Sequence, residues 1–174
     1  IADTMRRQDD RLMLCENAPA VVETLRAEMR GPGIAVHQRD GYGAWALLPP
    51  AEKRGLVLVD PAFEARDELD QMLTFARQAV GRFAHGIYAF WYPVKSQHSV
   101  DRFARRLAQQ VGRDVLDARL HIEAPRDGRM CGCGLAILNP PWAFAQALPD
   151  ALRALQAVLA QDRGAAHHIE HHTP

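Results

Sequence analysis

The order of apolar and polar positions along the chain alternates short apolar runs with longer segments of helical spacing. Apolar runs at residues 12–15, 34–38, 56–59 and 86–94 each predict a strand. Between them, apolar residues recur every three or four positions, which is typical of amphipathic helices packed on a sheet. Strands that alternate with helices predict a doubly wound α/β fold.

The helices expected between the strands are bounded by turn-forming residues. The first carries Val22, Leu25 and Met29 on one face, with Asn17 as its expected cap and a Gly-Pro-Gly stop at 31–33. Further helices are expected at residues 44–48, 69–83, 100–111 and 144–159. Strands at 115–122 and 134–138 follow each other closely and predict an antiparallel hairpin at one edge of the sheet. This interpretation gives six strands in all.

The segment at residues 55–64, GLVLVDPAFE, is the centre of the pattern. Its four apolar residues run unbroken up to Asp60, which predicts a strand buried on both faces of a parallel sheet. Asp60 then lies at the carboxyl end of that strand, where open α/β sheets bind their ligands.

The tetrad Asp60-Pro61-Ala62-Phe63 resembles motif IV of the amino-methyltransferases, Asp/Asn-Pro-Pro-Tyr/Phe. A carboxylate and the Pro61 carbonyl can accept the two N–H bonds of an exocyclic amine and so orient its lone pair toward a methyl donor. The Phe63 ring can stack on an extruded base. Ala62 departs from the motif and loosens the turn. Taken alone, these four residues also fit a strand end followed by an ordinary proline turn.

Composition limits the classes of function. The chain has 174 residues, of which 48% are hydrophobic and 24% charged, as in a single globular domain. Twenty-one basic residues balance 21 acidic ones, so no global positive field indicates a polyanion partner. Three cysteines do not make a disulfide framework. No apolar stretch approaches the ~18 residues of a membrane span, so we expect a cytoplasmic protein with no membrane partner.

Further motifs lie at consistent spacing around the central tetrad. They are Cys15-Glu16, Asp40-Gly41-Tyr42, IYAFWYP at 87–93, Gly-Cys-Gly at 132–134, and NPPW at 139–142. With these, residues 7–159 resemble the bacterial 23S rRNA adenine-N6 methyltransferase family, which is also associated with the use of external DNA. The resemblance implies a Rossmann-like class I S-adenosylmethionine-dependent methyltransferase sheet.

That sheet has seven strands, and the family's opening third, with the first strand and its glycine-rich loop, has no counterpart here. We therefore expect a methyltransferase-like domain at residues 1–160 that is incomplete at its amino terminus, followed by a polar tail at 161–174. The first strand would lie between the strands that end at Glu16 and Asp60, so two strand edges are expected to be unpaired.

The resemblance also implies site residues and partners. Asp60, Pro61 and Phe63 match the catalytic residues, and no metal is implied. Glu16 matches the acid that holds the ribose hydroxyls of S-adenosylmethionine, while Asp40 and Gly41 match the pair near its adenine. The substrate implied is an adenine N6 amine in 23S rRNA, free or partly assembled and not in the mature ribosome. Taken singly, Glu16 and Asp40 are also explained as helix caps or solvated strand ends.

Two other functions remain open from the sequence. The chain can be a truncated, non-catalytic Rossmann-like domain that binds nucleic acid or a protein. It can also be a DNA adenine methyltransferase, because motif IV does not distinguish DNA from RNA.

Several other signals are interpreted as structural. The tail contains His-x-x-Glu-His at 167–171, formally a zinc-peptidase pattern, but we expect a disordered tail with incidental metal affinity. We interpret Cys131-Gly-Cys133 as small residues at a tight strand entry. Asn139 is interpreted as the end of a strand or as part of the rim on the substrate side. The arginines of the 100–111 helix fit either RNA phosphate contacts or simple solvation. They are Arg102, Arg105 and Arg106.

Overall fold

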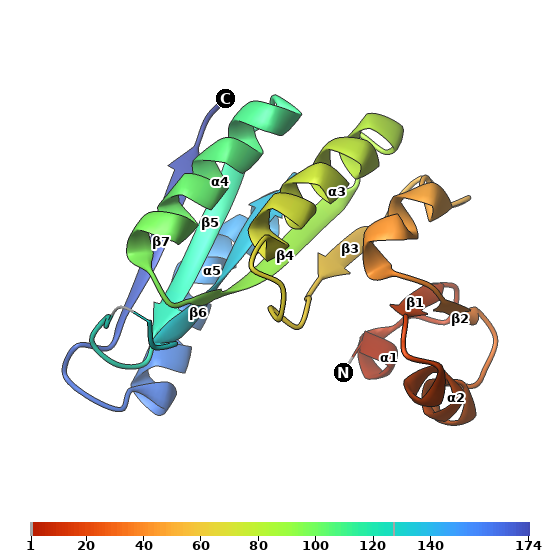
Figure 1. The fold of residues 1–174 in the computed structure, drawn as a ribbon, viewed down its shortest axis with the longest axis horizontal. Coiled ribbons are helices and arrows are strands. Elements are labelled where there is room, and N and C mark those ends of the chain that lie inside the picture. Colours follow the sequence, from red (N-terminus) through yellow and green to blue (C-terminus); the bar gives the residue numbers. More distant parts are fainter. Residues whose placement is uncertain (1, 127) are drawn as a thin grey trace. The chain divides into compact units, whose positions relative to one another are not determined.

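The computed structural model describes residues 2–126 and 128–174 and divides the chain into two compact units, 1–47 and 48–174. The first unit is built on two parallel strands joined by a helix (Figure 1). Its elements are α1 (Ala2–Met5), β1 (Leu12–Glu16), α2 (Pro19–Glu28), β2 (Ile34–Gln38) and the 3-10 helix η1 (Gly41–Leu47). Val22 is the hydrophobic side chain that this unit buries within its described part.

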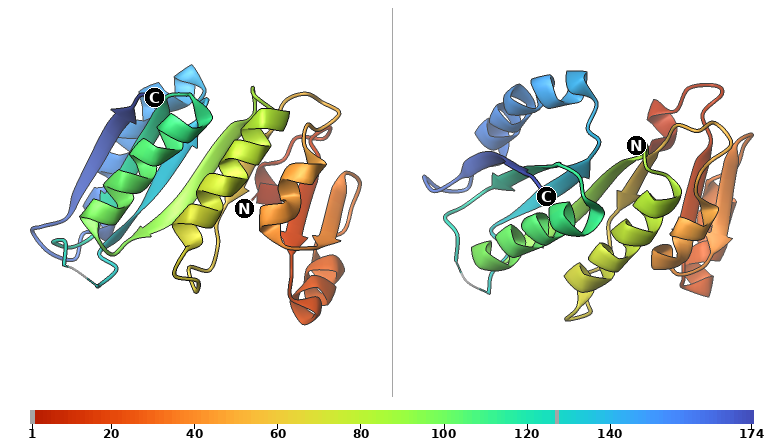
Figure 2. Two further views of the ribbon diagram at one scale, coloured as in Figure 1. Left: turned by 45° about the horizontal axis from the view of Figure 1, so that its top comes forward. Right: turned by 90° about the horizontal axis from the view of Figure 1, so that it is seen from above.

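The second unit holds a five-stranded sheet with helices on both faces. Its elements are β3 (Leu56–Val59), α3 (Glu68–Arg82), β4 (Ile87–Val94), α4 (Gln97–Val111), β5 (Val115–His121), β6 (Gly132–Leu138), α5 (Trp142–Leu159) and β7 (Ala166–His172). The strand order is β3-β4-β6-β5-β7, with β3 and β4 parallel and the remaining neighbours antiparallel. Helices α3 and α4 cover one face and α5 the other (Figures 1 and 2). The α/β class predicted from the sequence is confirmed.

The alternation of β4 divides the core of this unit into two layers. Tyr88, Phe90 and Tyr92 are fully buried toward α3 and α4, where Phe75 meets the ring of Phe90 edge-on and Phe103 that of Tyr92. Each buried aromatic contributes about 1.5–3 kcal/mol through removal of apolar surface from water. On the opposite face, β5 and β6 pack against α5. The side chains of that second layer include Leu116, Leu120, Ile137, Leu148 and Leu152.

Gly134 explains how β6 can lie beside the aromatic strand. A Cβ at this position would overlap the ring of Tyr92, which packs directly over it. Gly132 is similarly pressed against the backbone of Leu120. The small residues expected at a tight strand entry are confirmed, and Cys131 and Cys133 are free thiols.

The central strand differs from its prediction. Leu56 and Leu58 of β3 are 67% and 63% exposed, so the strand is not buried on both faces. Their register partners Ile87 and Ala89 face the α5 layer, but α5 makes its main strand contacts with β5 and β7, at the other side of the sheet from β3. A continuous apolar run therefore lies at a sheet edge. Within the described residues β3 pairs only with β4, and β1 only with β2, as expected for two unpaired edges.

The carboxyl-terminal region also differs from its prediction. The tail expected to be polar and disordered from residue 161 contains β7, which pairs antiparallel with β5 from Ala166 to His172. The sequence did not predict this strand because β7 is mostly polar. Its side chains alternate between the two faces of the sheet, but they show no alternation of apolar and polar residues. The predicted hairpin is confirmed as the antiparallel pair β5–β6, but β7 takes the edge position.

Among the described helices, none is both long enough and apolar enough to cross a membrane.

Candidate active site

Asp60, Pro61 and Phe63 follow β3 directly at its carboxyl end. The parallel pairing of β3 with β4 ends at Val59 and Phe90, so Asp60 leaves the sheet at the level of Trp91. Asp60 is exposed, and within the described part of the chain its carboxylate forms no hydrogen bond or ion pair. Both of its oxygens can therefore accept hydrogen bonds from a ligand.

Phe63 has a backbone conformation that non-glycine residues rarely adopt. Its φ angle is 54°, in the left-handed region, which costs a bulky residue about 1–2 kcal/mol. The half-buried ring packs edge-on against Trp91, with centroids 5.8 Å apart and planes at 70°. Strained residues of this kind cluster at functional sites. Asn139 and Lys53 share this backbone conformation, so the strain at Phe63 supports a functional role only together with the Asp60-Pro61 sequence beside it.

Trp91 is a member of the site that the sequence did not identify. Its position beside Asp60 depends on the register between β3 and β4, which a single sequence does not encode locally. Trp91 also hydrogen-bonds to Cys133 of β6, although burial has the larger effect and raises the pKa of that thiol. Cys133 is thus a neutral thiol near neutral pH and supports the aromatic pair without offering a nucleophile.

The three residues expected to hold a cofactor lie in the first unit. Glu16 and Gln38 are register partners at the ends of β1 and β2, and Arg39 donates its backbone N–H to the Glu16 carbonyl at 2.9 Å. This pairing brings the segment containing Asp40 and Gly41 to the same edge as Glu16. The structure thus gathers the predicted residues into two groups, one in each unit.

The carboxylates of Glu16 and Asp40 are both fixed by backbone N–H groups. Ala18 donates to Glu16 Oε1 at 2.7 Å, and Tyr42 donates to Asp40 Oδ1 at 2.9 Å. Asp40 therefore caps the start of η1. The cap expected from Asn17 is wrong: the N-cap of α2 is Ala18, and its N–H is taken by Glu16. In each carboxylate the second oxygen remains able to accept a hydrogen bond.

Packing does not require a glycine at position 41. A Cβ at this position would meet no atom within 4 Å. Next to Glu16, burial raises the pKa of the Cys15 thiol, an effect that Arg39 only partly offsets. The chemistry available at this edge is therefore that of fixed carboxylates and an open backbone, not of a thiolate.

Of the other side chains singled out in the sequence, Asn139 and Arg106 have structural partners. Asn139, with φ 52°, donates through Nδ2 to the carbonyls of Ala84 and Gly86 at 3.0 and 2.8 Å, which ties β6 to the turn before β4. Arg106 pairs with Asp70 of α3 at 2.6 Å. Arg102 and Arg105 remain exposed on α4.

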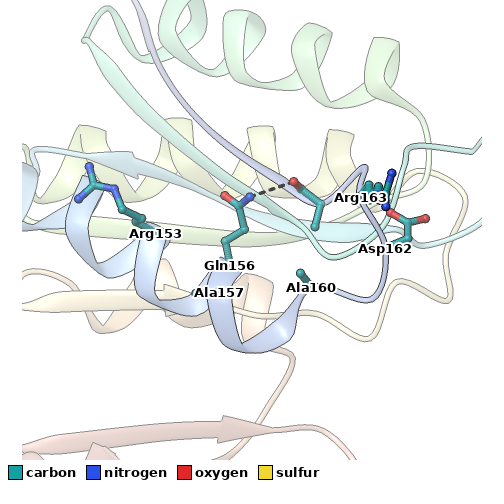
Figure 3. Close-up of a pocket in the computed structure, with 7 residues that line it drawn as sticks. Arg153, Gln156, Ala157, Ala160, Asp162 and Arg163 are labelled. Atoms are coloured by element: carbon teal, nitrogen blue, oxygen red, sulfur yellow. Dashed lines mark hydrogen bonds between the residues drawn. The ribbon is translucent and has the colours of Figure 1, made fainter.

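The second unit also has a surface cavity of about 360 Å³ between the end of α5 and the turn before β7 (Figure 3). Gln156 donates to the carbonyl of Ala165 at its centre, at 2.9 Å. Arg153, Asp162 and Arg163 supply its charged groups, and none of the predicted site residues lines it. The cavity is thus distinct from the segment that follows β3.

Comparison with known proteins decides the family. The model of the family described as Ribosomal RNA large subunit methyltransferase D, RlmJ matches residues 1–170. The chain belongs to this family. Membership of a methyltransferase family agrees with the Rossmann-like sheet predicted from the sequence and confirms that class.

Individual RlmJ-family relatives match most of the chain. Ribosomal RNA large subunit methyltransferase J of Escherichia coli is 33% identical over 162 residues, covering 91% of this chain and 58% of the relative. The Haemophilus influenzae protein of the same name is 32% identical, covering 100% of this chain and 63% of the relative. The crystal structure of protein LPL1258 from Legionella pneumophila superposes with a TM-score of 0.86 at 31% identity, covering 97% of this chain and 63% of that one. The chain thus spans about three fifths of the length of these relatives.

Proposed function

We propose that this protein transfers a methyl group from S-adenosylmethionine to the exocyclic N6 amine of an adenine in 23S rRNA. The observation that carries the proposal is the Asp60-Pro61 sequence at the carboxyl end of β3, within a chain that belongs to the RlmJ family. The two curated relatives are named as methyltransferases of large-subunit ribosomal RNA, which favours RNA over DNA as the substrate.

In this proposal Asp60 and Pro61 act on the attacking amine. The Asp60 carboxylate and the Pro61 carbonyl accept the two N–H bonds, which raises electron density on nitrogen and directs its lone pair. The exposure of Asp60 and its lack of partners among the described residues leave it free for this role. Methylation would require the amine to lose one proton, and the exposed Asp60 carboxylate would be able to accept it.

Phe63 and Trp91 are proposed to hold the target base. Enzymes that act on a base extrude it from its stack and bind it against aromatic side chains. The edge-on contact between the two rings fixes the orientation of Phe63, and the left-handed backbone at Phe63 maintains it. This arrangement supports stacking of an adenine at the position where Asp60 meets its amine.

Glu16, Asp40 and Gly41 are proposed to bind the cofactor, which supplies the electrophilic methyl group. Their donor set fits that group, because Glu16 is oriented by the Ala18 N–H and keeps an oxygen for the ribose hydroxyls. Asp40 is oriented in the same way by Tyr42. The open space around Gly41 supports close approach of a ligand to the backbone, where a side chain would intrude.

The RNA is proposed to be free or partly assembled 23S rRNA in the cytoplasm. Arg102 and Arg105, exposed on α4, are candidate phosphate contacts. If they are, their substitution weakens RNA binding at low salt more than at high salt, whatever the RNA sequence.

The substrate is tested by offering the protein tritiated S-adenosylmethionine with deproteinised 23S rRNA, intact 50S subunits or duplex DNA. We expect label in the free rRNA, little in the subunits and none in the DNA. Preferential labelling of DNA would make the protein a DNA adenine methyltransferase. Absence of label from all three, with a folded protein that binds RNA, would support the non-catalytic binding domain.

A further inference from the structure

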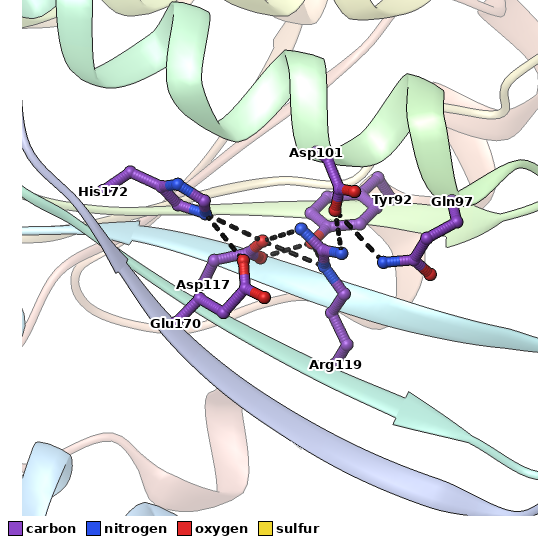
Figure 4. Close-up of polar contacts among 7 residues, drawn as sticks. All are labelled: Tyr92, Gln97, Asp101, Asp117, Arg119, Glu170 and His172. Carbon is purple, nitrogen blue, oxygen red and sulfur yellow. Dashed lines mark hydrogen bonds and ion pairs between the residues drawn. The ribbon is translucent and has the colours of Figure 1, made fainter.

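A cluster of polar side chains lies under α4, on the face of the sheet opposite α5 (Figure 4). It gathers at the antiparallel pair β5–β7, where Asp117 lies directly opposite Glu170. Glu170 and His172 are two residues apart on a strand and therefore share this face. Asp117 and His172 come from the two strands, so the cluster spans their junction. It lies apart from Asp60 and plays no part in the proposed methyl transfer.

The distances within the cluster are specific. His172 Nε2 lies 3.6 Å from Asp117 Oδ2 and 3.5 Å from Glu170 Oε2, and all three ligand atoms lie within 4.8 Å of one another. The His172 side chain is only 10% exposed. Its Nε2 atom is buried and makes no hydrogen bond within the part of the chain that the structure describes. A buried imidazole nitrogen is thus directed at two carboxylates without a hydrogen bond of its own.

The charges around this nitrogen favour a cation. Asp117 is fully buried and accepts hydrogen bonds from Tyr92 and Arg119, while Asp101 of α4 pairs with the same guanidinium. Arg119 pairs with Asp101 and with Asp117 Oδ2, and the carboxylate of Glu170, which lies beside His172, is the third negative charge of the cluster. Figure 4 shows Arg119 on the Asp101 side of Asp117 and His172 on the other.

We propose that Asp117, Glu170 and His172 form a binding site for a divalent metal ion of the zinc class. Zinc binds imidazole nitrogen and carboxylate oxygen at about 2.0–2.2 Å in tetrahedral geometry, which places neighbouring ligand atoms about 3.3–3.6 Å apart. The two distances from His172 Nε2 match these edges, and water completes the fourth position. The nitrogen donor disfavours magnesium, which prefers an octahedral set of oxygens.

This site differs from the histidine motif visible in the sequence. His167 and His171 belong to the His-x-x-Glu-His pattern, but on a strand they lie on the opposite face from Glu170 and His172. The metal ligands are thus selected by strand alternation and by the partner strand. Because Asp117 belongs to β5 and the other two ligands to β7, a bound ion fastens the last strand to the sheet.

The test is calorimetric titration of the protein with zinc chloride near neutral pH, after treatment with a chelator. We expect one zinc ion per chain and an increase in Tm with added zinc, because only the folded protein holds all three ligands. Glu170→Gln and His172→Gln are each expected to weaken binding at least tenfold. His171→Gln is the matched control, one residue away on the opposite face, and leaves the affinity unchanged. Cobalt(II) in place of zinc is expected to give the intense visible absorption of a tetrahedral site.

Three results would overturn the proposal. The first is no zinc binding to the wild-type protein. The second is equal weakening by His171→Gln and His172→Gln, which would show adventitious binding by a histidine-rich strand. The third is unchanged affinity in Glu170→Gln, a variant expected to fold because the Glu170 side chain is 54% exposed. Far-UV circular dichroism of each variant separates loss of a ligand from loss of the fold.

Discussion

At the scale of single residues, the buried pair Asp117 and Arg119 shows how strongly one side chain can depend on another. Both side chains are at most 2% exposed. Taking either charge out of water is costly, and the hydrogen bonds between them offset that cost only while both are present. Tyr92 depends on the same pair: burial and the neighbouring Asp117 carboxylate raise its pKa, so its hydroxyl stays protonated as a donor.

Replacing Arg119 with Met is expected to lower the free energy of unfolding by about 3–5 kcal/mol, because Asp117 is left as an uncompensated buried charge. Arg105→Met, on the exposed face of α4, is the control and should change it by less than about 0.5 kcal/mol. Urea denaturation measures both. Similar small effects of the two substitutions would contradict the described burial of the pair.

His121 makes stability depend on pH. Its side chain is buried, and this burial, together with His168 and Arg119, lowers its pKa. The unfolded chain therefore binds a proton more readily than the folded one, so the free energy of unfolding is highest above the ordinary histidine pKa of about 6.5 and falls as the pH drops below it.

His121→Gln should reduce the fall in the free energy of unfolding between pH 7 and 5, as measured by urea denaturation. The exposed His98→Gln serves as control, and identical profiles for both variants would refute this role.

Part of the candidate site could be predicted from the sequence. Asp60, Pro61 and Phe63 were placed correctly at a strand end, because an apolar run that stops at Asp-Pro is a local signal. Trp91 was not predicted as a site residue, because its position beside Asp60 depends on the pairing of β3 with β4. The cofactor roles of Glu16, Asp40 and Gly41 stay predictions.

At the scale of elements, local periodicity predicted helices α2, α3, α4 and α5 and six of the strands, whereas α1 and the strand β7 were not predicted. β7 has no apolar alternation, since its partners on one face are the polar groups of β5. The predicted burial of β3 was wrong because an apolar sequence does not guarantee that a strand is covered on both faces. An apolar run specifies a strand, but whether a helix covers that strand depends on the rest of the sheet.

The exposure of β3 can be measured by a matched pair of substitutions in the 174-residue chain. Leu58→Ala removes a side chain that is 63% exposed, so the free energy of unfolding should fall by less than about 1 kcal/mol. Leu138→Ala removes a fully buried one on β6 and should cost about 2–5 kcal/mol through the cavity it leaves. Equal costs would show that β3 is covered after all.

At the scale of the whole molecule, we expect the two units to differ in their capacity to fold alone. Within the described residues the first buries one hydrophobic side chain, Val22, whereas the second contains the other core residues. Two strands and two short helices without a core are marginal in water. The sequence predicted one domain, because strands and helices alternate regularly across the boundary at residue 48.

We expect the fragment 48–174 to unfold cooperatively in urea, and the fragment 1–47 to show little secondary structure by circular dichroism. The reason is that the five-stranded sheet keeps both of its helical layers in the longer fragment. A shorter fragment that folds by itself, or a longer one that does not, would contradict this division of the stabilising contacts.

The central claim is that Asp60 orients an adenine amine for methylation. The most direct test is mass spectrometry of nucleosides from 23S rRNA treated with S-adenosylmethionine and the wild-type protein, Asp60→Ala or Glu64→Ala. Glu64 is an exposed carboxylate on the same loop and controls for loss of charge. We predict N6-methyladenosine with the wild type and Glu64→Ala, and a loss of about 10²–10³-fold with Asp60→Ala, as for removal of a preorganised transition-state contact. Equal activity of the two variants would contradict the account.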